Sequence, residues 1–143
     1  MSIKQLSIFI ENKPGRLAEI TEAIANSGVD IRAISVADTA DFGILRVIVD
    51  KPDTAVKCLK ENGMTVSLTD VIAVGIEDQP GTFAKSMRIL ADEGFTVEYI
   101  YAFVSRDRGK AYIIIRADNG EAAAECLKKN GVQILSPEEL YNM

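Results

Sequence analysis

Two short polar segments, residues 12–15 and 78–81, contain the residue types in this chain best suited to holding a small charged molecule. Their sequences are NKPG and DQPG, and each lies between an alternating apolar run and an amphipathic helical pattern. Each segment is therefore expected at a strand-to-helix corner. The first amides of a helix lack intrahelical partners, and the helix dipole stabilises negative charge there. These corners predict binding of a carboxylate or a phosphate.

The side chains of the two corners extend this prediction. Proline is preorganised for the first position of a helix, and the glycine after it removes a side chain that would block close approach. Asn12 and Asp78 add acceptor oxygens. An α-amino acid satisfies both halves, with its carboxylate on the amides and its ammonium on the side-chain oxygen. The alternative is that Asn12 and Asp78 only cap their helices, as these residue types commonly do.

The first half of the chain has the periodicities of alternating strands and helices. Apolar residues alternate along residues 3–10 and recur at helical spacing along residues 14–27, and Gly28 follows as a helix end with positive φ. The expected elements are strands at 3–10, 30–37, 44–49 and 64–68, helices at 14–27 and 52–61, and a hairpin loop at 38–43. This βαββαβ order predicts a ferredoxin-like α+β domain, with two helices on one face of an antiparallel sheet.

The same pattern then repeats along the second half of the chain. Pro14, Gly28 and Gly43 recur 66 positions later, whereas Cys58 and its neighbours recur 68 positions later. We infer that two residues have entered the loop after the third strand, around residues 118–120. A period this long is typical of a duplicated domain. We therefore predict two tandem domains, residues 1–69 and 70–143.

The composition argues against several classes of function. A net charge of −5 disfavours nucleic acid, because such partners require a basic surface. Histidine is absent, which removes the commonest general base and metal ligand. No nucleophile is paired with a base, so we expect no catalytic residue, no metal and no cofactor.

The cysteines and the apolar runs indicate the cellular compartment. Cys58 and Cys126 stand at equivalent positions of two helices, and we expect two buried thiols rather than a disulfide. No apolar run reaches the ~18 residues of a membrane span, and no signal peptide precedes the first strand. We expect a cytoplasmic protein with no membrane partner.

At this point the sequence resembles a known family, the ACT domains, which are small ferredoxin-like regulatory modules that bind amino acids. The resemblance is carried by residues 11–17, by residues 28–31 and by Gly43 before a β-branched strand, with the same frame in the second copy. It covers essentially the whole chain, which is similar to a stand-alone tandem ACT protein.

The resemblance also implies where a ligand binds. In ligand-binding members, contacts come from the loop before the first helix and from the start of the second strand, often across neighbouring domains. Thr96 stands where the first copy has Asp30, a departure that weakens or retunes the second site. Many tandem ACT domains bind nothing, so one pair of sites is as consistent with the resemblance as two. The candidate ligand-binding residues are Asn12, Lys13, Pro14, Gly15, Arg16, Leu17, Asp30, Ile31, Asp78, Gln79, Pro80, Gly81, Thr82, Phe83 and Thr96.

Apolar residues on both faces of the expected sheets predict a partner chain. Ile48 and Ile114 lie opposite the core-like residues of their strands, and the aromatic residues Tyr99, Tyr101 and Phe103 share one face. Helices cover only one face, so we expect a homodimer through the sheet face and the domain edges. An aromatic face also suits RNA bases, but the acidic balance argues against that alternative.

Three hypotheses for the function follow. The first is a non-catalytic sensor that binds a small amino acid at ACT domain interfaces and modulates a metabolic enzyme or its own assembly. The second is a ligand-free scaffold for protein association. The third is a small enzyme on a ferredoxin-like fold, against which the lack of histidine and of clustered metal ligands argues.

Overall fold

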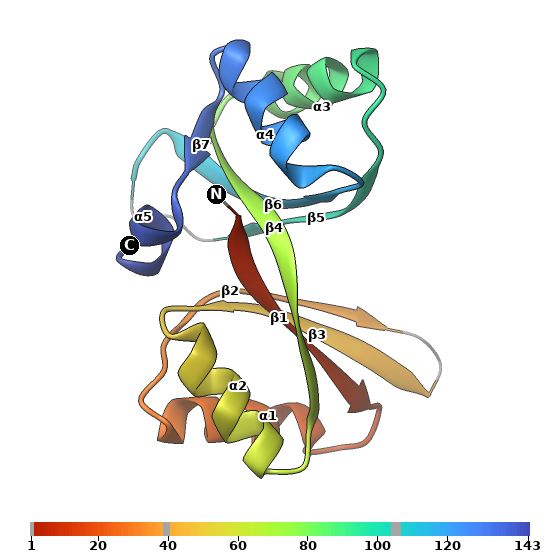
Figure 1. Ribbon diagram of the computed structural model, residues 1–143, viewed down its shortest axis with the longest axis vertical. Helices are drawn as coiled ribbons and strands as arrows, with labels where there is room; N and C mark the ends of the chain where they lie inside the picture. Colours follow the sequence, from red (N-terminus) through yellow and green to blue (C-terminus); the bar gives the residue numbers. More distant parts are fainter. Residues whose placement is uncertain (1, 39–40, 104–106) are drawn as a thin grey trace. The chain divides into compact units, whose positions relative to one another are not determined.

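The computed structural model describes residues 2–38, 41–103 and 107–143, and these divide into two compact units. The first unit contains Lys4–Thr69 and Tyr141–Met143, and the second contains residues 2–3 and Asp70–Leu140. Each unit has strands and helices in the βαββαβ order (Figure 1), which confirms the predicted fold class. No helix in the described part of the chain is long and apolar enough to cross a membrane.

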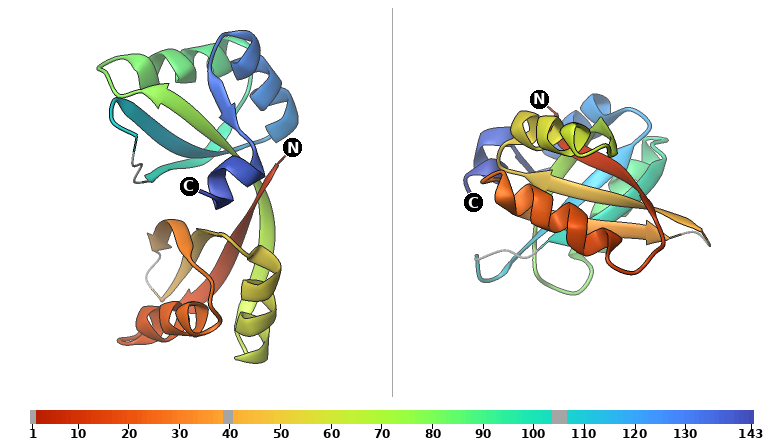
Figure 2. Two further views of the ribbon diagram at one scale, coloured as in Figure 1. Left: turned by 90° about the vertical axis from the view of Figure 1, so that its left-hand side faces the viewer. Right: turned by 90° about the horizontal axis from the view of Figure 1, so that it is seen from below.

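The first unit has a four-stranded sheet with two helices on one face (Figures 1 and 2). Among the described residues, its strands follow the order β2-β3-β1-β4, and β3 is antiparallel to both β1 and β2. The elements are β1 (Ile3–Glu11), α1 (Arg16–Asn26), β2 (Ile31–Asp38), β3 (Phe42–Val49), α2 (Pro52–Glu61) and the first part of β4 (Thr65–Glu77). The predicted hairpin loop at 38–43 includes residues 39 and 40, which lie outside the described residues.

The second unit repeats this arrangement with the strand order β7-β4-β6-β5. A short helix follows the last strand. The elements are the remainder of β4, α3 (Thr82–Asp92), β5 (Val97–Phe103), β6 (Lys110–Ala117), α4 (Gly120–Lys129), β7 (Gln133–Leu135) and α5 (Pro137–Tyr141).

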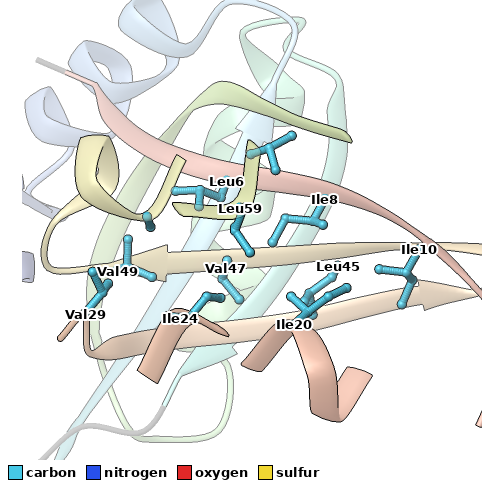
Figure 3. Close-up of a cluster of buried hydrophobic side chains, with 12 residues drawn as sticks. Leu6, Ile8, Ile10, Ile20, Ile24, Val29, Leu45, Val47, Val49 and Leu59 are labelled. Carbon is cyan, nitrogen blue, oxygen red and sulfur yellow. The ribbon is translucent and has the colours of Figure 1, made fainter. Parts of the chain in front are cut away.

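The core of the first unit lies between its sheet and its helices (Figure 3). Leu6 and Ile8 on β1 are fully buried, as is Leu45 on β3, and they pack with Ile24 and Leu59 from the two helices. These are the positions that alternate along a strand or recur every three to four residues along a helix. The second unit has an equivalent core built from β4, β6, α3 and α4.

Strand pairing corrects the position of the inserted residues. Ile10 pairs with Gly43 in the first unit, whereas Ile76 pairs with Ala111 in the second. Ile10 and Ile76 are 66 positions apart, whereas Gly43 and Ala111 are 68 positions apart. The two extra residues therefore lie between β5 and β6, and the prediction that they lie near residues 118–120 is wrong.

The glycines explain this error. Gly43 and Gly109 are 66 positions apart and were matched for that reason, but Gly43 lies within β3 while Gly109 has a φ of 80° in the turn before β6. The two glycines have different structural roles, so their shared residue type does not show that the two positions are equivalent.

The corner that starts α1 also differs from the prediction. The helix begins at Arg16, and Gly15 before it has φ 87° and ψ −11°; Gly81 before α3 has φ 93° and ψ −16°. The proline therefore precedes the helix rather than occupying its first position. A Cβ added at Gly15 or Gly81 would meet no atom within 4 Å. Each glycine is required for its left-handed backbone rather than for close approach of a ligand.

We expect Gly15→Ala and Gly81→Ala each to lower the free energy of unfolding by about 1–2 kcal/mol, because an L side chain is strained at this φ. Urea denaturation followed by circular dichroism measures the change. Gly120→Ala is the matched control, since Gly120 has no positive φ and its added Cβ would lie 4.0 Å from the Ile72 side chain. This control is expected to leave stability unchanged or slightly raised. Equal losses in all three variants would contradict the role of φ.

Candidate functional site

The two predicted corners share one backbone framework. In each, the residue after the first strand donates an amide hydrogen bond to the hairpin ahead of the third strand, from Asn12 to Asp41 O at 3.0 Å and from Asp78 to Gly109 O at 2.8 Å. A tight turn follows, with Lys13 N donating to Glu11 O in the first corner at 2.9 Å. The second corner repeats this turn between Gln79 N and Glu77 O at the same distance.

The Asn12 side chain fastens the first corner to the β2–β3 hairpin. Its Nδ2 donates to the Asp38 carboxylate and to the Phe42 carbonyl oxygen at 3.3 Å. Neither α1 nor α3 has a side-chain cap, because the N-cap residues are glycines. The alternative that Asn12 and Asp78 cap their helices is therefore wrong.

Charged side chains of both signs surround the first corner. Lys13 Nζ lies 2.9 Å from a Glu11 carboxylate oxygen, and Arg16 lies 3.9 Å from the same carboxylate and 3.4 Å from that of Glu19. The hydrogen bond from Lys13, followed by its charge, lowers the pKa of the Glu11 carboxyl, and Arg16 contributes least. These ion pairs are exposed and screened by solvent, so a ligand can rearrange them at small cost.

Lys13→Gln is expected to raise the pKa of Glu11 toward its ordinary value, because it removes both the hydrogen bond and the neighbouring charge. Arg16→Gln is the comparison and should raise this pKa less, since Arg16 lies farther from the carboxylate. Carbon-detected NMR titration of the Glu11 carboxyl measures both shifts. A larger effect of Arg16→Gln would show that the Lys13 contact does not control this group.

A cavity of about 390 Å³ adjoins these charges. This volume lies within the ~300–1,000 Å³ typical of ligand sites. The ring of Phe42 forms part of its wall and stacks on Phe9, with ring centroids 4.9 Å apart. The lining residues are Glu11, Asn12, Lys13, Asp41 and Phe42. Of these, Asn12 and Lys13 were predicted from the sequence, whereas Glu11, Asp41 and Phe42 were not.

The second corner has the same backbone but different chemistry. The Thr82 hydroxyl turns back and donates to Glu77 O at 2.5 Å and to Gln79 O at 2.9 Å. Lys110 Nζ pairs with the Glu77 carboxylate at 2.9 Å. The adjoining cavity is smaller, about 190 Å³, and Thr82, Lys85 and Lys110 are among its lining residues.

The helix residues that follow the two glycines are solvent-facing. Leu17 on α1 and Phe83 on α3 occupy equivalent positions and are 42% and 43% exposed. Neither lines the cavity at its own corner. These two predicted site residues therefore lie beside the corners without contributing to their walls.

Asp30 and Thr96 lie at the other end of their sheets. The Asp30 amide donates to Asp50 Oδ1 at 2.9 Å, directly after β3, and the Thr96 amide donates to Asp118 Oδ1 at 3.1 Å, after β6. Asn12 meets the opposite end of β3, which at ~3.3 Å per residue is roughly 20 Å away. Ile31 pairs with Val49 and packs against the core. Within one unit, a single amino acid cannot contact both sets of predicted residues.

The second unit also contains a cavity of about 620 Å³ that the sequence did not indicate. It lies at the start of α4, and its lining includes Asp70, Asp118, Glu121 and Glu125 but one arginine, Arg116. Arg116 already bonds Glu98 at 3.0 Å and the Asp70 carbonyl oxygen at 2.7 Å. The excess of carboxylates disfavours a carboxylate ligand there. Within the described residues, no three Cys, Asp or Glu side chains group as metal ligands would.

The fold and the paired corners define a tandem of two ferredoxin-like domains. A family model described as an ACT domain pair matches residues 1–143, so the chain belongs to the ACT domain family. None of the curated proteins matches the chain.

Solved structures with the same architecture include protein BT0572 from Bacteroides thetaiotaomicron. It is 43% identical, with a TM-score of 0.94, and the match covers 100% of this chain and 98% of that one. The regulatory subunit of aspartate kinase from Thermus thermophilus, in its ligand-free form, is 23% identical with a TM-score of 0.65, covering 88% and 91%. The subunit from Thermus flavus is 21% identical with a TM-score of 0.62, covering 88% and 90%.

Proposed function

We propose that this ACT domain pair is a non-catalytic, cytoplasmic regulatory protein that binds an amino acid at the corner before α1. The observation that carries the proposal is the cavity lined by Lys13, which combines one cation, two carboxylates and an apolar wall. A free α-amino acid presents one negative and one positive group, and this corner offers partners for both.

The corner can hold each group separately. Lys13 on the cavity wall, with Arg16 beside it at the start of α1, suits the ligand carboxylate. Glu11 and Asp41 line the same cavity and suit the ligand ammonium. The Asn12 side chain positions this wall, since it bonds the hairpin that precedes β3.

Regulation follows if the ligand binds one arrangement of the protein better than another. The Thermus thermophilus neighbour is a regulatory subunit of aspartate kinase. We therefore extend the proposal to modulation of a metabolic enzyme or of the chain's own assembly. The competing accounts are an association scaffold without a ligand and a small enzyme.

A thermal shift assay against the twenty L-amino acids tests the proposal. A ligand at a hundred times its dissociation constant adds about 2.7 kcal/mol, which raises the melting temperature by several degrees. Lys13→Gln combined with Arg16→Gln is expected to reduce this shift, because it removes the cations that face the ligand carboxylate.

Arg88→Gln is the matched control for the thermal shift assay, since Arg88 is an exposed arginine on α3 that pairs with Asp92. It should leave the shift unchanged. We prefer these variants to Asn12→Ala, which would also loosen the hairpin. If no amino acid raises the melting temperature of the unaltered chain, the sensor is ruled out and the scaffold remains.

We also propose a homodimer, formed by pairing of β2 with β2 of a second copy. The strand is the edge of the first unit's sheet among the described strands, and Ile34 and Val36 on it are 45% and 46% exposed. Such an apolar edge is a template for pairing with another chain. Ile48 and Ile114, by contrast, are fully buried in the single chain and give no reason for a partner.

One antiparallel register of β2 with its copy is self-complementary. Centring the pair on Ser35 places Ile34 opposite Val36 and Arg32 opposite Asp38, each twice by symmetry. Centring on Ile34 instead places Asp38 opposite Asp30, and centring on Val36 places Ile34 opposite Asp38. Only the Ser35-centred register of these three matches both charge and hydrophobicity.

Arg32→Asp and Asp38→Arg are each expected to weaken the dimer up to about tenfold, because each creates two like-charge pairs. The double variant restores opposite charges and should recover dimerisation. Light scattering after size-exclusion chromatography measures the oligomeric state across a dilution series, with circular dichroism to verify the fold. Failure of the double variant to recover would reject this register.

A further inference from the structure

The aromatic pair beside the first corner is exposed although it is apolar. Phe9 and Phe42 stack with their ring planes 28° apart, and the two side chains remain 51% and 43% exposed. Phe42 also lines the cavity with Lys13 and Glu11. Exposed apolar surface rimmed by charged residues is typical of ligand-binding grooves.

At the positions equivalent to Phe9 and Phe42 the second copy has no aromatic side chain, and its stacked rings are instead those of Phe103 and Tyr112, with centroids 5.6 Å apart. Strand pairing places Gly75 at the position of Phe9 and Lys110 at that of Phe42, because Glu11 pairs with Phe42 as Glu77 pairs with Lys110. The space over Gly75 is taken by the chain itself, since a Cβ there would lie 2.6 Å from Gln133 Oε1.

We propose that the first copy selects an amino acid with a large apolar or aromatic side chain, and that the second copy does not bind it. This inference rests on the proposed function and replaces the small amino acid expected from the sequence. The charged residues at one side of the cavity hold the zwitterionic end of the ligand. Its side chain then lies against Phe42, where aromatic stacking and loss of exposed apolar surface favour bulky apolar groups over small or charged ones.

Isothermal titration calorimetry of the full chain with L-leucine, L-methionine and L-phenylalanine, against L-serine and L-aspartate, tests the selectivity. The key variant is Phe42→Lys, which installs the residue of the second copy. Lys110 pairs with Glu77 at 2.9 Å, and a lysine at position 42 faces Glu11 in the same register, so this variant is expected to fold. It should weaken binding of the bulky amino acid about tenfold.

Leu68→Ala is the matched control, because Leu68 is an apolar side chain as exposed as Phe42 but lies on β4 and does not line the cavity. It should leave the affinity unchanged. Binding of L-serine or L-aspartate that is insensitive to Phe42→Lys would overturn this inference and leave the proposed function standing. Absence of binding for every amino acid in the thermal shift assay would remove both.

Discussion

The left-handed glycine between the first strand and the first helix is the constraint on which each unit depends. At φ near 90°, Gly15 and Gly81 let the chain leave the sheet and start a helix that returns across it. An L side chain at either position would strain the backbone that fixes this direction. The direction of α1 brings Ile24 over Leu6 and Leu45 in the core.

Duplication kept the backbone of the corner and changed its chemistry. The amide bond from Asn12 to the Asp41 carbonyl has its equivalent between Asp78 and Gly109, because a backbone bond does not depend on which side chains are present. Side chains are under no such restriction. Where the first corner has two cations, Lys13 and Arg16, in exposed ion pairs, the second has a Thr82 hydroxyl bonded to its own turn. Two corners with one geometry can therefore differ in whether they bind a ligand.

The fold could be predicted from the sequence because periodicity is a local property. Alternation around Leu6 and helical spacing around Ile24 determine which faces are buried, and two copies of the pattern reinforce one another. The site was less predictable because it depends on strand register. Phe42 reaches the cavity only because it pairs with Glu11, some thirty residues earlier in the chain. Asn12 is a residue type that often caps helices, but Gly15 is the N-cap of α1. The side-chain amide of Asn12 therefore bonds Asp38 instead.

Asp38 links the two surfaces that the proposals invoke. Its carboxylate accepts from Asn12 at the ligand corner, and it ends β2, the strand proposed to pair with a second copy. In the Ser35-centred register the same carboxylate faces Arg32 of that copy. A ligand that shifts the Asn12 side chain in the cavity would thus also shift Asp38 and weaken its attraction across the edge, and removal of the ligand would restore it. Linkage makes the effect reciprocal, because dimerisation must change the affinity for the ligand by the same factor as the ligand changes dimerisation. Under these proposals, ligand binding and dimerisation are coupled through Asp38 alone, and no separate conformational change of the domain is required.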